Sequence, residues 1–302
     1  MNSKQLGRTA VAIPEIGLGT WDYSGGPEPL RAGLEAGALF IDTAESYGSE
    51  EVVAEAMRGI REKVFLATKV SPNHLRRADV FTAADHSLRR LRTDWIDLYQ
   101  IHMPNPAIPV EETLGAMEEL VDAGKVRFIG VSNFPVRELE LARRAMRKYP
   151  IVSNQVRYNL ADRTIEGGLL ADCQAHDITV IAYSPLGREL QRLADCDPNG
   201  ALTQIAREAG KSVPQVVLNW CLCHDGVVVI PKGSSAAHVL DNCGASGWRL
   251  SAEQFRRLDE EILSRRRTAL DSLLRRLAPG GAIPFLKRCI RRLPPSLRRK
   301  LN

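Results

Sequence analysis

The sequence lacks long apolar runs and any cysteine spacing typical of a metal site. None of its 302 residues falls in a run of about 18 uncharged apolar residues, which excludes a transmembrane helix. The opening MNSKQLGRTAVAIPEIG lacks the apolar core of a signal peptide, so we expect a cytoplasmic protein. We expect reduced thiols and no metal, because no CxxC pair occurs among Cys173, Cys196, Cys221, Cys223, Cys243 and Cys289.

The net positive charge of the chain comes from its C-terminal end. Residues 262–302 contain 12 Lys or Arg and one acid, whereas residues 1–261 contain 29 bases and 35 acids. The body is therefore mildly acidic, and no nucleic-acid partner is expected from its charge. Apolar residues make up 44% and charged residues 25%, which excludes a disordered chain and predicts a sizeable core.

Short apolar segments alternate with amphipathic segments through most of the chain. Several of the apolar segments show little alternation, as in parallel strands that are buried on both faces. Strands are predicted at 16–18, 39–41, 64–68, 96–101, 126–131, 151–155, 179–183 and 227–230, and the helix candidates include 49–58, 78–91, 110–123, 137–146, 168–176, 213–223 and 251–263.

Eight such strand–helix units favour a closed α/β barrel over an open sheet. No GxGxxG motif follows the first strand, which disfavours a Rossmann fold. We therefore predict a (β/α)8 TIM barrel, with a short hairpin within residues 4–13 closing its floor and a C-terminal helical extension. Residues 187–200 predict an enlarged loop that folds over a ligand.

Polar side chains stand at the end of nearly every predicted strand. The carboxyl ends of barrel strands meet at one mouth, where reactive residues collect. A barrel with only a structural role does not need polar groups at its mouth, so we expect a functional site there. The residues at or just beyond these strand ends are Asp42 and Tyr47, Thr68 and Lys69, His102, Ser132 and Asn133, Asn154 and Gln155, Tyr183 and Ser184, and Pro231 and Lys232.

Four of these residues form a set suited to proton transfer. A lysine at the end of a buried strand is costly unless its charge is paired, and Asp42 is the natural partner of Lys69. A nearby ammonium favours the phenolate and thus lowers the pKa of Tyr47. His102 can orient a carbonyl or share in the proton transfer. We therefore expect Tyr47 to act as a general acid near neutral pH.

Five short motifs in these positions resemble the aldo-keto reductase superfamily. They are FIDTAESYGSE at 40–50, ATK at 67–69, DLYQIH at 97–102, GVSNF at 130–134 and AYSPLG at 182–187. The resemblance runs in order from about residue 17 to residue 242 and covers roughly three quarters of the chain. Each motif alone is modest evidence for the resemblance, but five motifs in the right order at the right strand ends are specific to the family.

The resemblance implies an enzyme that reduces aldehydes or ketones with hydride from a nicotinamide cofactor. It implies that Tyr47 is the proton donor, that Lys69 and Asp42 tune its pKa, and that His102 positions the carbonyl. It further implies that the nicotinamide and pyrophosphate portions of the cofactor contact Thr20, Trp21, Asp42, Ser132, Asn133, Gln155, Tyr183, Ser184, Leu186 and Gly187.

The stretch IPKGSSAAHVLDN at 230–242 resembles the adenosine end of the family's cofactor site. The resemblance implies that Lys232 and Ser234 contact a 2′-phosphate, which favours NADPH, and that Asp241 and Asn242 reach the adenine. His238 stands where many members have arginine, and a neutral histidine grips phosphate less well than a guanidinium. NADH therefore remains a possible second cofactor.

Residues 264–302 form a basic tail beyond a barrel domain at 1–263. Leucines at helical spacing alternate with arginine pairs and predict two short amphipathic helices separated by 279–281. Three interpretations stay open: docking on the barrel or on a second subunit, peripheral association with an anionic membrane, and binding to nucleic acid or an acidic protein. The chain is otherwise expected to be a monomer or a weak oligomer.

The sequence leaves two functions from different classes open. The first is reduction of small carbonyl substrates. The second is a nucleotide-sensing regulatory barrel that acts through its basic tail on a partner or membrane. An intact set of four proton-transfer residues favours the enzyme, because a sensor needs no proton donor.

Overall fold

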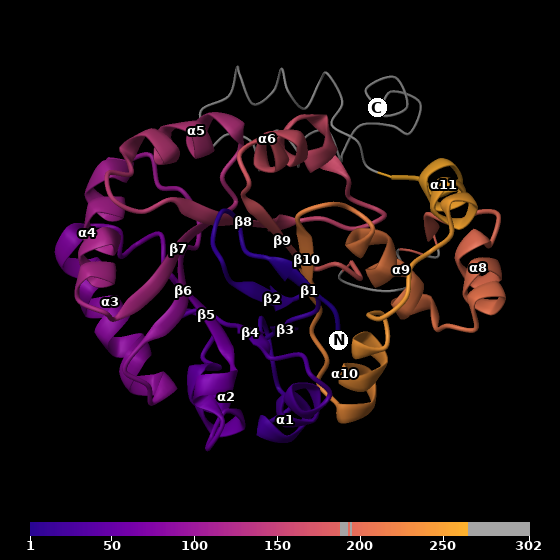
Figure 1. Ribbon diagram of the computed structural model, residues 1–302, viewed down its shortest axis with the longest axis horizontal. Helices are drawn as coiled ribbons and strands as arrows, with labels where there is room; N and C mark the ends of the chain where they lie inside the picture. Colours follow the sequence, from indigo (N-terminus) through magenta and orange to yellow (C-terminus); the bar gives the residue numbers. More distant parts are fainter. Residues whose placement is uncertain (188–192, 194, 265–302) are drawn as a thin grey trace, which may run out of the picture.

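Eight parallel strands form the centre of the protein. The computed structural model describes residues 1–187, 193 and 195–264 (Figure 1). Neighbouring strands pair in chain order, which is the expected result of successive right-handed strand–helix units. The strands are β3 (Leu18–Gly19), β4 (Phe40–Asp42), β5 (Phe65–Val70), β6 (Ile96–Ile101), β7 (Val126–Ser132), β8 (Ile151–Arg157), β9 (Thr179–Tyr183) and β10 (Val227–Ile230).

Backbone contacts beside β3 and β10 close the sheet into a barrel. Ile16 forms a parallel bridge with Val229, and the Gly19 amide donates to the Pro231 carbonyl at 3.1 Å. A Cβ atom at Gly19 would lie 2.5 Å from the Ile230 carbonyl oxygen, so only glycine allows this approach. The predicted TIM barrel is confirmed.

Helices cover the outside of the barrel (Figure 1). Helix α3 illustrates why they pack there, because Val80, Ala84 and Leu88 recur every four residues and are buried. The described helices are α1 (Pro27–Glu35), α2 (Glu50–Ala56), α3 (Arg77–Leu91), α4 (Val110–Asp122), α5 (Val136–Ala145), α6 (Leu169–Ala175), α8 (Ala201–Ala209), α9 (Val213–Leu222), α10 (Ala236–Cys243) and α11 (Ala252–Glu261), with short 3₁₀ helices η1 (Arg61–Lys63) and η2 (Thr164–Gly167).

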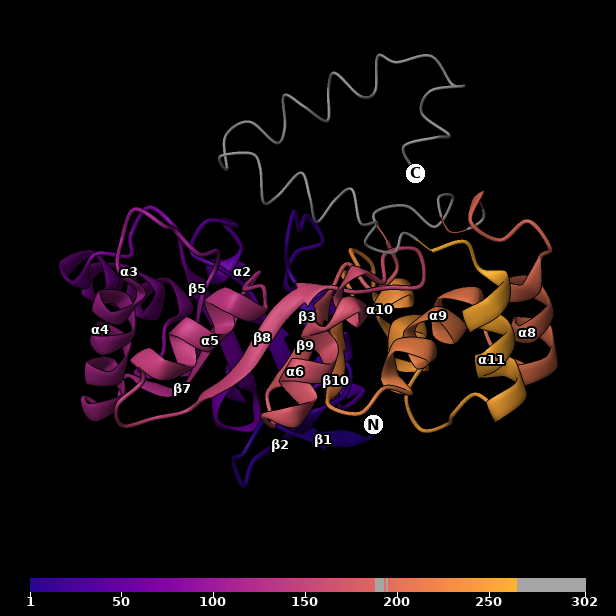
Figure 2. The ribbon, with the colours of Figure 1, turned by 90° about the horizontal axis from the view of Figure 1, so that it is seen from above.

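An N-terminal hairpin closes the floor of the barrel, as predicted. Strands β1 (Ser3–Gln5) and β2 (Ala12–Pro14) are antiparallel, and both Leu6, which follows β1, and Ile13 of β2 are fully buried. The Gly7 amide donates to the hydroxyl of Thr179, the first residue of β9. Figure 2 shows the hairpin at one end of the barrel. The carboxyl ends of the strands therefore lie at the opposite end of the barrel.

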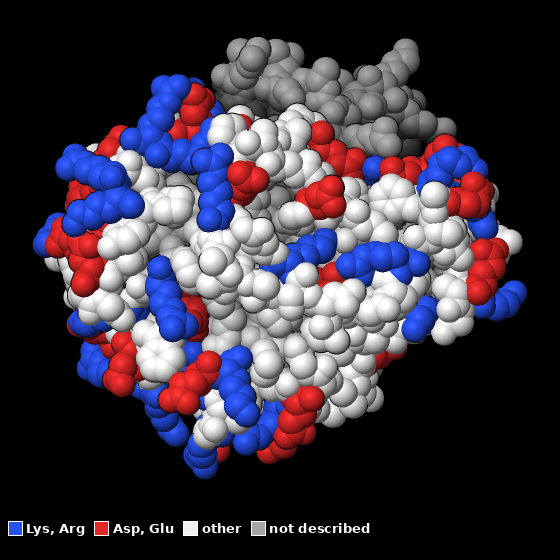
Figure 3. Space-filling model, in the orientation of Figure 1, with Lys and Arg blue, Asp and Glu red and all other residues white. Residues whose placement is uncertain are grey.

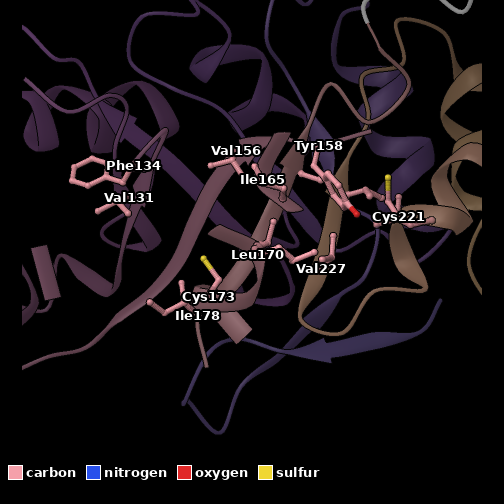
Figure 4. Packing of buried hydrophobic residues seen from close by; sticks show 14 of the residues in the cluster. Val131, Phe134, Val156, Tyr158, Ile165, Leu170, Cys173, Ile178, Cys221 and Val227 are labelled. Atoms are coloured by element: carbon pink, nitrogen blue, oxygen red, sulfur yellow. The ribbon is translucent and has the colours of Figure 1, made fainter. Parts of the chain in front are cut away.

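The largest apolar cluster fills the layer between strands and helices. Figure 4 shows side chains from β7, β8, α6 and β10 in this layer, with Leu170 and Cys173 of α6 turned towards the strands. Burying one such side chain stabilises the fold by about 1.5–3 kcal/mol. The mouth is thus built on a rigid support.

Charged side chains lie mainly on the outside of the molecule. On the face seen in Figure 3, basic and acidic groups stand side by side around the periphery. Exposed ion pairs such as Arg77–Glu119 join many of the charged side chains. Such exposed pairs contribute only about 0–1 kcal/mol each. Among the described residues, no helix is both long and apolar enough to cross a membrane.

The predicted strands and the helix candidates given above agree with the structure to within a few residues. Ser49, the first residue of a helix candidate, precedes α2, and its side chain makes no helix-capping bond. Its hydroxyl instead bonds to the hydroxyls of Thr20 and Thr43, because these two groups face it from the barrel mouth. The predicted tail helices, and residues 188–192 and 194 of the predicted loop, lie outside the described residues.

Candidate active site

A buried ion pair forms the base of the site. Asp42 ends β4 and Lys69 lies near the end of β5, with side chains that are 2% and 0% exposed. The Lys69 Nζ donates to Asp42 Oδ1 at 2.5 Å and to the Thr43 carbonyl at 2.8 Å. A buried ammonium is stable only with such partners, so the pairing expected from the sequence is confirmed.

Two glutamines satisfy the second oxygen of the carboxylate. The side-chain amides of Gln155 and Gln100 donate to Asp42 Oδ2 at 2.7 and 3.1 Å. Gln100 was not predicted as a site residue, although it lies on β6 two residues before His102 and so faces the same side. These bonds satisfy the second carboxylate oxygen of Asp42 and fix the orientation of the carboxylate towards Lys69.

Tyr47 and His102 complete the set above the ion pair. The Tyr47 hydroxyl lies 3.4 Å from Lys69 Nζ and 3.3 Å from His102 Nε2. The Lys69 ammonium also lies 4.8 Å from the centre of the Tyr47 ring. The structure therefore brings Asp42, Tyr47, Lys69 and His102 together around one hydroxyl group.

The electrostatics of the set correct one expectation. Burial raises the pKa of Tyr47 above its ordinary value, and the positive charge of Lys69 opposes this shift without cancelling it. The predicted lowering of the Tyr47 pKa is therefore wrong, because removing the phenolate from water costs more free energy than its attraction to Lys69 offsets. Tyr47 is consequently a protonated phenol at neutral pH.

Lys69 and His102 differ in charge at physiological pH. Burial alone would lower the pKa of Lys69, but Asp42 and Tyr47 outweigh burial, and the pKa of Lys69 is raised. Burial, with help from Lys69, lowers the pKa of His102 to about 4. The site thus presents a lysine cation beside a neutral imidazole at physiological pH.

A second set of polar groups lies next to the four residues. Asn133 follows β7 with a left-handed φ of 62°, and its side-chain amide donates to the His102 carbonyl at 3.1 Å. Its Oδ1 accepts from the Tyr183 hydroxyl at 3.0 Å, and the Ser132 hydroxyl donates to the Gln155 carbonyl at 2.9 Å. These bonds hold an aromatic ring beside an amide and a hydroxyl.

A cavity of about 670 Å³ opens above these residues at the barrel mouth. That volume is within the usual range for small-molecule sites. Eleven of the residues that the resemblance assigns to the cofactor line it, namely Thr20, Trp21, Asp42, Ser132, Asn133, Gln155, Tyr183, Ser184, Leu186, Gly187 and Lys232.

The remaining residues assigned to the adenosine end lie outside this cavity. Ser234 and His238 are exposed beside the start of α10. Asp241 accepts hydrogen bonds from the side chains of Ser212 and Gln215, and Asn242 is buried. In this structure the Asp241 carboxylate therefore contributes to the contact between α9 and α10.

The sequence model of the family described as "Aldo/keto reductase family" matches residues 15–262. The chain belongs to this family. Methylglyoxal reductase YeaE of Escherichia coli (strain K12) is 39% identical over 273 residues, which cover 86% of this chain and 95% of that protein. Glyoxal reductase of Bacillus subtilis (strain 168) is 36% identical over 255 residues, covering 82% of this chain and 89% of that protein.

Solved structures of aldo/keto reductases have the same fold. The crystal structure of an aldo/keto reductase from Klebsiella pneumoniae in complex with NADP and acetate is 40% identical to this chain. Its TM-score is 0.80, and the match covers 88% of this chain and 97% of that chain.

Several cavity residues of this aldo/keto reductase were not predicted as site residues. Asp22, Met103 and Arg157 all line the cavity. Asp22 and Met103 lie in loops that have no regular period, and Arg157 follows Gln155 at the alternating position on β8. For Arg157 the sequence does hold a signal: it stands two residues after Gln155, so both side chains lie on the same side of β8. Within the described residues, no group of three metal-ligating side chains is placed to hold an ion.

Proposed function

We propose that this aldo/keto reductase is an NADPH-dependent reductase of small aldehydes and ketones, with Tyr47 as the general acid. The observation that carries the proposal is the convergence of Lys69 and His102 on the Tyr47 hydroxyl at the wall of the cavity. Other arrangements of these side chains would leave the phenol without a charge partner or without access to a substrate.

The donor set around the cavity fits a nicotinamide dinucleotide. Tyr183 offers an aromatic face for a planar ring, and Ser132 and Asn133 offer groups that match a carboxamide. Lys232 supplies a cation for a phosphate at the far side of the cavity. The complex of the Klebsiella pneumoniae enzyme with NADP supports this assignment.

A bound reduced nicotinamide would supply the hydride that adds to the carbonyl carbon of the substrate. Tyr47 gives its hydroxyl proton to the carbonyl oxygen in the same reduction, so that the product is an alcohol. The raised pKa of Tyr47 keeps this proton in place until it is needed. Lys69 then stabilises the phenolate, and Asp42 holds Lys69 in its charged form.

His102 positions the carbonyl oxygen in this proposal. Its imidazole is neutral at physiological pH because its pKa is about 4. A neutral ring can donate one hydrogen bond to the carbonyl oxygen without adding a second cation beside Lys69. The 3.3 Å separation from Tyr47 places both groups around one substrate atom.

The proposed substrates are short carbonyl compounds of the methylglyoxal and glyoxal type. The names of two relatives, methylglyoxal reductase and glyoxal reductase, support this class. Trp21 and Met103 line the cavity with side chains that are 49% and 50% exposed, which gives its entrance an apolar character.

The decisive experiment is NADPH consumption with a panel of aldehydes and ketones that includes methylglyoxal and glyoxal. We expect turnover that requires both the cofactor and the carbonyl compound. NADPH binding without turnover on any member of the panel would overturn the enzyme and favour the nucleotide-sensing barrel.

The location of the protein and the role of its tail are part of the proposal. The five cysteines among the described residues are free thiols, which supports a cytoplasmic setting.

We propose that residues 264–302 are a unit separate from the barrel domain at 1–263, and that this unit binds peripherally to anionic membranes. Salt-sensitive binding to anionic vesicles should disappear when residues 265–302 are deleted, and equal binding by the truncated chain would refute it.

A further inference from the structure

Lys232 is engaged across the cavity by the loop that follows β3. Its Nζ donates to the Asp22 backbone carbonyl at 2.8 Å and lies 3.6 Å from Asp22 Oδ2. The two loops also touch through their backbones, because a Cβ atom at Gly25 would lie 2.6 Å from the Ser234 carbonyl oxygen. Asp22 and Lys232 both line the cavity. An acid therefore accompanies the cation that the family resemblance assigns to the 2′-phosphate.

We propose that Asp22 sets the balance between NADPH and NADH, an inference that rests on the proposed cofactor site. A phosphate that binds Lys232 comes close to the Asp22 carboxylate, and the two anions repel each other. A ribose 2′-hydroxyl carries no charge and can donate a hydrogen bond to the same carboxylate. Asp22 therefore weakens binding of the phosphorylated cofactor and favours the unphosphorylated one.

The size of the effect follows from the exposure of the pair. The Asp22 side chain is 76% exposed and that of Lys232 is 37% exposed, so water and salt screen the repulsion. A single carboxylate a few ångströms from a phosphate in this setting should change affinity by about fivefold. Asp22 thus adjusts selectivity without abolishing the binding of either cofactor.

Asp22→Asn is the variant that isolates this charge. Asp22 has a left-handed φ of 52°, a conformation that asparagine tolerates better than most residues. The bond from Lys232 goes to the backbone carbonyl and is therefore available in the variant. Glu62→Gln is the matched control, because it removes one negative charge from an exposed residue of η1, at the end of the barrel opposite the cavity.

The test is calorimetric titration of NADPH and NADH into the wild type and the variants, without substrate. We expect Asp22→Asn to raise the ratio of NADPH to NADH affinity about fivefold and Glu62→Gln to leave it unchanged. Lys232→Gln should weaken NADPH by about tenfold and NADH much less.

Each other outcome has a definite meaning. An unchanged ratio in Asp22→Asn, or a shift towards NADH, overturns the role of Asp22 while the proposed function stands. An unchanged NADPH affinity in Lys232→Gln overturns it as well, because the 2′-phosphate would then lie elsewhere. A wild-type chain that binds neither dinucleotide overturns both the inference and the proposed function.

Discussion

Two tyrosine–histidine pairs with nearly the same geometry occur in this barrel. The Tyr47 and His102 rings have centroids 5.4 Å apart at an interplanar angle of 77°, and the Tyr158 and His224 rings have centroids 5.4 Å apart at 78°. The hydroxyl-to-Nε2 distances are 3.3 and 2.9 Å. A search for paired phenol and imidazole groups alone would therefore find two candidate sites.

The surroundings separate the two pairs. Tyr47 has the Lys69 ammonium beside it and a cavity above it, whereas the Tyr158 hydroxyl donates to the Glu166 carboxylate at 2.8 Å and lines no described cavity. Burial first of all, with Glu166 adding to it, raises the pKa of Tyr158 far above its usual range. A cation within hydrogen-bond distance of the hydroxyl and access to the cavity, and not the pair itself, distinguish Tyr47 from Tyr158.

The largest expected effect on stability comes from removing the cation. Lys69→Met leaves the buried Asp42 carboxylate without its counter-charge and should lower the free energy of unfolding by about 3–5 kcal/mol. Urea denaturation measures this change. The double variant Asp42→Asn with Lys69→Met should recover part of the loss, and a double variant as unstable as the single one would contradict the pairing argument.

A smaller loss is expected at the second pair. Tyr158→Phe removes one hydroxyl from Glu166 and His224 and should cost about 1–3 kcal/mol in unfolding free energy. Carbonyl reduction by the folded variant should keep the wild-type rate. A loss of reduction without a loss of stability would mean that this pair also takes part in catalysis.

The smallest effect is a dependence of stability on pH at His102. Its pKa is lowered from 6.5 to about 4 in the folded chain, so the unfolded chain binds the proton more readily. The contribution of His102 to the free energy of unfolding is therefore fully present above about pH 6.5 and is lost as the pH falls towards 4. The loss should be about 1–2 kcal/mol after solvent screening. His102→Gln should flatten the curve in denaturation experiments between these values.

His86→Gln is the control for that experiment, because His86 is exposed on α3. It should leave the pH dependence of stability as in the wild type. An equal flattening in both variants would place the dependence somewhere other than His102.

The sequence was sufficient to predict the barrel and the residues at its mouth. Strand ends carry Asp42, Lys69 and His102 into one site because parallel strands finish at the same end of a barrel. The pKa direction of Tyr47 could not be predicted, since it depends on how deeply the ring is buried. The hydrogen bonds from Ser212 and Gln215 to the Asp241 carboxylate could not be predicted either, because they depend on how α9 and α10 pack.

The most direct test compares single-turnover reduction of methylglyoxal by Tyr47→Phe and Tyr158→Phe, each loaded with NADPH. Loss of the general acid should slow Tyr47→Phe by about 10²–10⁴-fold with little change in NADPH affinity, while Tyr158→Phe keeps the wild-type rate. Reduction by Tyr47→Phe at the wild-type rate would contradict the assignment of Tyr47 as the proton donor.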